Sequence, residues 1–203
     1  MSETGDASDG NDVKLTRSVL ESKAAVYPDV QPLYTVEREH LEMLPETFAE
    51  GDYGWRDAEW VVQWYYRRFL GAYPDRKRRA VEDAYGENSY EEVHAAITAA
   101  VEADDAAAKL ANLTGLDGVD VPVGSAFLQF IDPERHLAVG EREWGVLRTA
   151  GELTGGYPDP PSVEEYERYL STCQAVADRC ECDLQSLYRA IWVLGEDETT
   201  DDD

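Results

Sequence analysis

The sequence predicts an all-α protein, because helix signals run along most of the chain and strand signals do not. Two Ser-x-x-Glu capping boxes, at 89–92 and 162–165, mark helix starts, since the serine hydroxyl and the glutamate each satisfy a free backbone N–H. Apolar residues follow the first box at helical spacing, at Val93, Ile97 and Ala100. No segment of four or more residues alternates cleanly between apolar and polar positions, as a half-buried strand does.

The helices are placed in chain order from their apolar stripes, capping residues and breakers. Asp57 and Asp183 each precede an apolar stripe and are expected to cap helices, while Gly195 is expected to end the last one. Residues 154–161 hold two glycines and three prolines, so we expect a loop there. Helices are expected at about 13–25, 36–50 with a break at Pro45, 58–70, 76–85, 90–102, 104–113, 122–131, 141–150, from 162 onward and 183–195.

The chain is strongly acidic, because its 203 residues hold 43 Asp+Glu against 18 Lys+Arg, a formal net charge of −25. Only 4 of the basic residues are lysine. A dense acidic surface poor in lysine resembles that of halophilic proteins from high-salt cytoplasm, where charge keeps a chain soluble and salt screens its self-repulsion. The composition argues against a broadly basic nucleic-acid binder. The wide spread of acid favours global adaptation over an acidic mimic of DNA.

One helical domain is expected at residues 13–195, between two disordered acidic tails at 1–12 and 196–203. No apolar run approaches the ~18 residues that a membrane helix needs, and no signal peptide is recognisable, so we expect a cytoplasmic protein. The three cysteines and three histidines lack the spacing of a zinc site, so no metal or other cofactor is expected.

Residues 110–128 read LANLTGLDGVDVPVGSAFL and form the most distinctive pattern of the chain. One helix is expected to end within this stretch, a glycine-containing turn follows, and Pro122 suits the first turn of the next helix. This arrangement resembles the helix-hairpin-helix motif, and the similarity extends over about residues 55–194 to the DNA glycosylases that contain this motif. The resemblance implies an all-α, glycosylase-like fold in which the amides of Gly118 and Val119 hold a DNA phosphate.

The chain departs from the glycosylase pattern at the positions that carry chemistry. Where some glycosylases have a lysine nucleophile this chain has Pro122, and where the family has an aspartate it has Gly140. Asp117 and Asp120 stand at the hairpin's proline and second glycine. Their carboxylates repel a phosphate there, unless Asp120 serves only as the N-cap of the next helix. Glu141 adjoins the aspartate position but points about 100° away from it on a helix, so it is not assigned as a catalyst. We therefore expect no enzyme, and a glycosylase or lyase of base excision repair is the least favoured alternative.

Residues 56–79 are the basic exception in an acidic chain, with seven basic residues against three acidic ones. Tyrosines interleave with them, as stacking of nucleic-acid bases requires. We predict a non-catalytic domain that binds a nucleic-acid backbone, such as that of DNA, through this segment and the hairpin. The alternative is an interaction or scaffold protein that has lost the DNA site and binds an acidic partner through the same arginines. The candidate backbone contacts in the segment are Arg67, Arg68, Arg76, Lys77, Arg78 and Arg79.

Overall fold

The computed structural model describes the backbone of residues 14–200 and the side chains of residues 14–196. Within that range it contains ten helices and no strand, which confirms the all-α class. The predicted tail at 1–12 lies outside the described residues, and none of the described helices is long and apolar enough to cross a membrane. The helices are α1 (Arg17–Val30), α2 (Tyr34–Glu50), α3 (Trp55–Arg67), α4 (Asp75–Tyr85), α5 (Tyr90–Glu102), α6 (Ala106–Leu113), α7 (Val121–Ile131), α8 (Glu141–Thr149), α9 (Val163–Cys180) and α10 (Leu184–Thr200).

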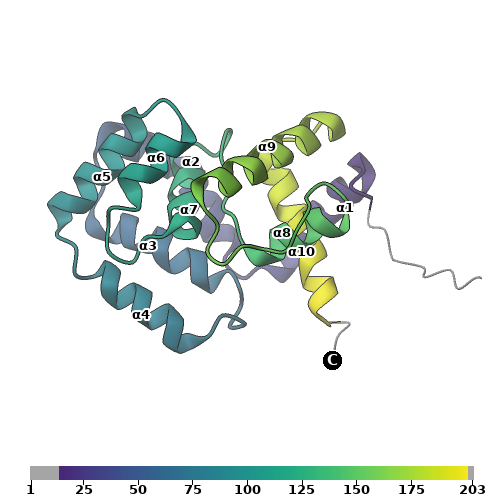
Figure 1. The fold of residues 1–203 in the computed structure, drawn as a ribbon, viewed down its shortest axis with the longest axis horizontal. Coiled ribbons are helices and arrows are strands. Elements are labelled where there is room, and N and C mark those ends of the chain that lie inside the picture. The colour runs from purple at the N-terminus through teal and green to yellow at the C-terminus, as the bar shows by residue number, and fades with distance from the viewer. Residues whose placement is uncertain (1–13, 201–203) are drawn as a thin grey trace, which may run out of the picture.

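The helices surround α7, whose residues from Pro122 to Ile131 are all buried. A helix that is apolar on every side is expected in the interior of a domain. α2, α3, α6 and α9 all pack against it. At one end of the molecule α5 pairs with α6, and at the other α10 packs against both α1 and α8 (Figure 1).

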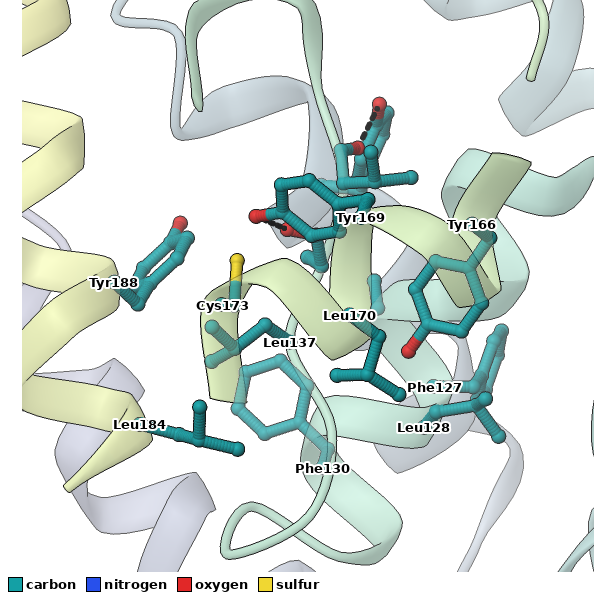
Figure 2. Close-up of a cluster of buried hydrophobic side chains, with 14 of the residues drawn as sticks. Phe127, Leu128, Phe130, Leu137, Tyr166, Tyr169, Leu170, Cys173, Leu184 and Tyr188 are labelled. Carbon is teal, nitrogen blue, oxygen red and sulfur yellow. Dashed lines mark hydrogen bonds between the residues drawn. The ribbon is translucent and has the colours of Figure 1, made fainter. Parts of the chain in front are cut away.

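Aromatic side chains fill the core where α7, α9 and α10 meet. Phe127 and Phe130 of α7, Tyr169 of α9 and Tyr188 of α10 belong to one cluster of buried side chains, and all four are fully buried (Figure 2). Side chains of this size bury roughly 150–250 Å² each, so they dominate the stability of the core. The Tyr169 hydroxyl also has a polar partner, since it donates to the carbonyl oxygen of Ala138 at 3.0 Å.

Side chains fix the stretch that joins α7 to α8. The N–H of Ala138 donates to Gln129 Oε1 at 2.7 Å, and the N–H of Val139 donates to Ser125 Oγ at 3.0 Å. The carbonyl oxygen of Val139 accepts a hydrogen bond from the Tyr65 hydroxyl at 3.0 Å. Because the polar groups of this buried stretch have partners, the chain reaches the start of α8 along one defined course.

Several predicted helix starts are confirmed. Ser89 and Ser162 form capping boxes, and each hydroxyl oxygen accepts the N–H three residues later at 3.2 Å. Asp183 stands before α10, where its carboxylate accepts the N–H of Ser186 at 2.7 Å. The region predicted as a loop, 154–161, contains no helix. Local side-chain chemistry therefore sets where these helices begin.

Two predictions about α2 and α3 are wrong. α2 runs through Pro45 without a break, because Leu44 and Phe48 on either side of the proline are held in the core. Asp57 is the third residue of α3 instead of its cap, and its carboxylate accepts the N–H of Gly54 at 2.8 Å. In α2, core packing outweighs the missing N–H of the proline. In α3, the helix begins before Asp57, so the carboxylate bonds back to the cap residue from within the first turn.

The last helix continues beyond its predicted end. α10 extends to Thr200, so residues 196–200 are helical, whereas residues 201–203 lie outside the described part of the chain. Gly195 does not end the helix. A Cβ at this position would meet the side chain of Arg142 on α8, so the glycine allows α8 and α10 to approach each other closely.

Acid should destabilise the protein through His136, which is 5% exposed. Burial lowers the pKa of His136 to about 4, against 6.5 for a free imidazole. As pH falls through 6.5, the unfolded chain binds a proton that the folded chain does not, so stability is lost between pH 6.5 and about 4. We expect a loss of about 2 kcal/mol at pH 5, and urea unfolding over this pH range measures it. His136→Gln should remove this pH dependence and His40→Gln should retain it; equal pH dependence in all three proteins would contradict the assignment.

Candidate nucleic-acid interface

Four of the six candidate bases stand free on the surface. Arg67 ends α3, and Arg76, Lys77 and Arg79 lie in the first turns of α4. All four are exposed, and no hydrogen bond or ion pair within residues 14–196 involves their side chains. Arg78 differs, because its guanidinium donates to a carboxylate oxygen of Glu82 at 2.9 Å and to another of Asp75 at 3.2 Å. We call these four bases the basic patch. Of the six predicted contacts, they are the ones that remain accessible to a ligand.

Arg68 is in the core, so its predicted contact with a phosphate is wrong. It is 0% exposed, and its Nη1 donates to Glu143 Oε1 and to the Tyr188 hydroxyl, the latter at 3.0 Å. Its guanidinium carbon lies 4.7 Å from the ring centroid of Tyr65. Burial alone lowers the pKa of Arg68, but the charge of Glu143 and the hydroxyl groups of Tyr188 and Tyr65 together more than offset this and keep the pKa well above its ordinary value. A phosphate outside the protein cannot reach this charge.

Two amides of the hairpin between α6 and α7 donate hydrogen bonds within the protein. The N–H of Asp117 donates to Asn88 Oδ1 at 3.0 Å, and the N–H of Val119 donates to the carbonyl oxygen of Leu116 at 3.2 Å. Val119 is buried, so the structure removes it from the candidate phosphate contacts. Gly118 has a φ of +74°, and a Cβ at this position would point at the backbone of α4. The hairpin is therefore a packed turn whose contacts are with its own domain.

A groove opens beside the basic patch, with a volume of about 740 Å³. It lies where the starts of α4, α7 and α8 meet the end of α3, and we call it the α4–α8 groove. Pro122, at the position of the glycosylase lysine, lines it, and so does the exposed Glu141. Its aromatic walls come from Tyr65, Tyr66, Phe69, Tyr73 and Tyr157, and its charged lining from Lys77, Asp120, Glu141, Arg142, Arg148 and Asp159.

The aspartate position of the glycosylase pattern has no room for a side chain. A Cβ on Gly140 would lie 2.6 Å from Glu143 Oε2 and 2.7 Å from Arg68 Nη2. Both of those atoms are buried without a hydrogen-bond partner in the described part of the chain. The buried Arg68–Glu143 pair thus occupies the space that a side chain at position 140 would need.

Helix ends add positive potential around the groove. Pro74 precedes α4 and Gly140 precedes α8, and neither offers a side chain to the free N–H groups that follow it. Such unpaired N–H groups, together with the helix dipole, favour a nearby anion. α7 is different, because Asp120 caps it and accepts the N–H of Val123 at 3.0 Å. Burial raises the pKa of this Asp120 carboxyl.

Arg142, in the first turn of α8, is a groove residue that the sequence did not single out. Its guanidinium carbon lies 4.6 Å from the ring centroid of Trp192 and 6.0 Å from that of Phe69. Its Nη1 is buried and has no hydrogen-bond partner among the described residues. An arginine that has no carboxylate partner within the described part of so acidic a chain marks this wall of the groove as favourable for an anion.

The cysteines and histidines do not gather into a metal site. Among the described residues, no group of three or more His, Cys, Asp or Glu side chains is placed to hold a metal ion. Cys173 and Cys180 are buried free thiols, and burial raises the pKa of Cys173 to about 12. Cys173 is therefore held as an unreactive thiol in the core.

Comparison of the chain with family models, with curated proteins and with solved structures found no match in any of the three. The resemblance to the helix-hairpin-helix glycosylases consequently stays a prediction based on the hairpin residues. The basic patch and the α4–α8 groove are the features that bear on function.

Proposed function

We propose that this protein is a non-catalytic, helix-hairpin-helix-like domain that binds the phosphate backbone of a nucleic acid through its basic patch. The observation that carries the proposal is that Arg67, Arg76, Lys77 and Arg79 are exposed and have no acidic partner among the side chains of residues 14–196, in a chain with a net charge of −25. Basic side chains that stay unpaired on an otherwise acidic surface are available to bind an external anion. Phosphate groups are the partner that such a cluster attracts most generally.

The number of bases in the patch limits how steeply binding depends on salt concentration. Each phosphate neutralised on a single strand contributes about −0.7 to the slope of log K against log salt concentration. Four contacts give a slope of about −3. The Val119 N–H of the hairpin adds nothing to this value, because it is already bonded within the protein.

Removing two of the four bases should halve this salt dependence. In the double variant Arg76→Gln/Arg79→Gln, we expect weaker binding of a labelled oligodeoxynucleotide and a slope of about −1.5. Fluorescence anisotropy over a series of potassium chloride concentrations measures both quantities. Arg56→Gln/Arg135→Gln is the matched control, since both of its positions are exposed arginines outside the patch.

Two results would count against the proposal. The first is a wild-type slope that the patch variant leaves unchanged, and the second is an equal loss in the control variant. If instead the protein ignores oligonucleotides at low salt but binds poly-glutamate through the same arginines, it is an interaction protein for acidic partners. The closed hairpin favours that second candidate, because it removes one class of phosphate contact.

A further inference from the structure

The α4–α8 groove has one acidic wall. Asp120 and Asp159 both line it, and their charges act together on the Tyr73 hydroxyl, whose pKa is raised first by burial and then by these two carboxylates. Asp120 acts in the same direction on the Tyr66 hydroxyl, where burial again is the larger cause of the raised pKa. Carboxylates that stand beside aromatic rings accept hydrogen bonds from amino groups on a planar ligand.

A second wall carries Arg142. Arg142 lies against Trp192 of α10, and no ion pair joins it to Asp120 or Asp159. Arg148 lines the groove from the same helix, and a Cβ on the intervening Gly145 would meet no atom within 4 Å. The face of α8 is therefore open above its two arginines. The uncapped N–H groups at the start of α8 add to the attraction for an anion.

Aromatic rings lie between these two walls. Phe69, Tyr73 and Tyr157 line the groove and are half-buried. The centroids of Phe69 and Tyr73 are 5.9 Å apart. Ring faces of this kind stack on a planar heteroaromatic ligand, with a contribution of about 1–3 kcal/mol for a nucleobase. The groove volume of about 740 Å³ falls within the usual range of small-ligand sites.

We propose that the α4–α8 groove binds a nucleotide with a terminal phosphate and an exocyclic amino group on its base. The phosphomonoester contacts Arg142 and Arg148, the base stacks on Phe69 and Tyr73, and its amino group donates to Asp120 or Asp159. Two sources share this chemistry: the phosphorylated end of a nucleic-acid strand and a free mononucleotide. The strand end rests on the function proposed above, because Lys77 lines the groove and also belongs to the basic patch.

Glu141 opposes this ligand and offers a test of the phosphate position. It is exposed in the first turn of α8 and lines the groove beside Arg142. A carboxylate at the start of the helix competes with a phosphate for the same positive potential. Glu141→Gln should therefore bind the phosphorylated ligand more tightly than the wild type and leave affinity for the unphosphorylated one unchanged.

The experiment compares a short oligodeoxycytidylate with and without a 5′-phosphate, and cytidine monophosphate with uridine monophosphate, by isothermal titration calorimetry. We expect the terminal phosphate to tighten binding about tenfold or more, as a charge-assisted hydrogen bond does. Arg142→Gln and, separately, the exposed Arg148→Gln should each reduce that gain, while Arg56→Gln should not. Cytidine monophosphate should bind more tightly than uridine monophosphate, because only cytosine has the amino group.

Each outcome bears on one claim. Oligonucleotide binding that is indifferent to the terminal phosphate overturns the groove assignment and leaves the basic patch in place. Cytidine monophosphate binding that depends on Arg142, without oligonucleotide binding, supports the groove with a free nucleotide and overturns the patch. Equal affinity for the two mononucleotides overturns the role of Asp120 and Asp159.

Discussion

Replacing Glu143 by glutamine is expected to lower the free energy of unfolding by about 3–5 kcal/mol, because it leaves the Arg68 guanidinium charged and without a counter-ion in the core. Both side chains are 0% exposed, and within the described residues the Arg68 guanidinium has only the Tyr188 hydroxyl and the Tyr65 carbonyl oxygen as other hydrogen-bond partners. Urea unfolding at neutral pH, followed by far-ultraviolet circular dichroism, measures the loss. The expected cost is a large part of the stability of a typical domain.

Two comparisons isolate the cause of this loss. The exposed pair between Glu152 and Arg179 has N–O distances down to 2.5 Å, yet Glu152→Gln should cost less than about 1 kcal/mol because water screens that pair. The double variant Arg68→Met/Glu143→Leu should recover much of the stability, since it removes both buried charges together. A Glu143→Gln protein as stable as the wild type would show that this pair does not bear on folding.

The substitution Gly118→Ala is expected to destabilise the protein by about 2–6 kcal/mol. Position 118 has a φ of +74°, which costs a residue with a Cβ about 1–3 kcal/mol. The added Cβ would also lie 2.7 Å from the Val81 carbonyl oxygen and 2.8 Å from the Tyr85 N atom, and such overpacking costs about 1–3 kcal/mol more. These are backbone atoms of α4, so relief requires the helix itself to shift. Chemical denaturation measures the change.

Gly71→Ala separates the two contributions to the Gly118 effect. Gly71 has a φ of +91°, but a Cβ there would meet no atom within 4 Å. It should therefore show only the conformational part of the loss. Equal losses at the two positions would mean that the hairpin is not packed closely against α4.

The sequence predicts helices well where local chemistry controls them. Ser89 and Ser162 begin helices as expected, because a capping box is complete within four residues. Boundaries that depend on packing were placed wrongly. Pro45 lies within a continuous helix and Gly195 lets two helices approach, and both effects come from side chains far away in the sequence.

The candidate site was only partly predictable for the same reason. Arg67 and Arg76 are exposed as expected, whereas Arg68 is buried. Its burial had a signal in the sequence, because position 68 follows Val61 and Trp64 at the spacing of one helix face. Arg142 had no such signal, since the walls of its groove come from α3, α4, α7, α8 and the loop before α9.

Nucleic acid is expected to contact the basic patch and the adjoining groove, while the hairpin stays packed against α4. Ultraviolet crosslinking of the full chain to a 5′-phosphorylated oligodeoxycytidylate, followed by peptide mapping, tests it most directly. We predict crosslinks within residues 67–79, centred on Phe69 and Tyr73. Crosslinks at Gly118 and Val119 without any in that segment, or none at all at low salt, would contradict the account.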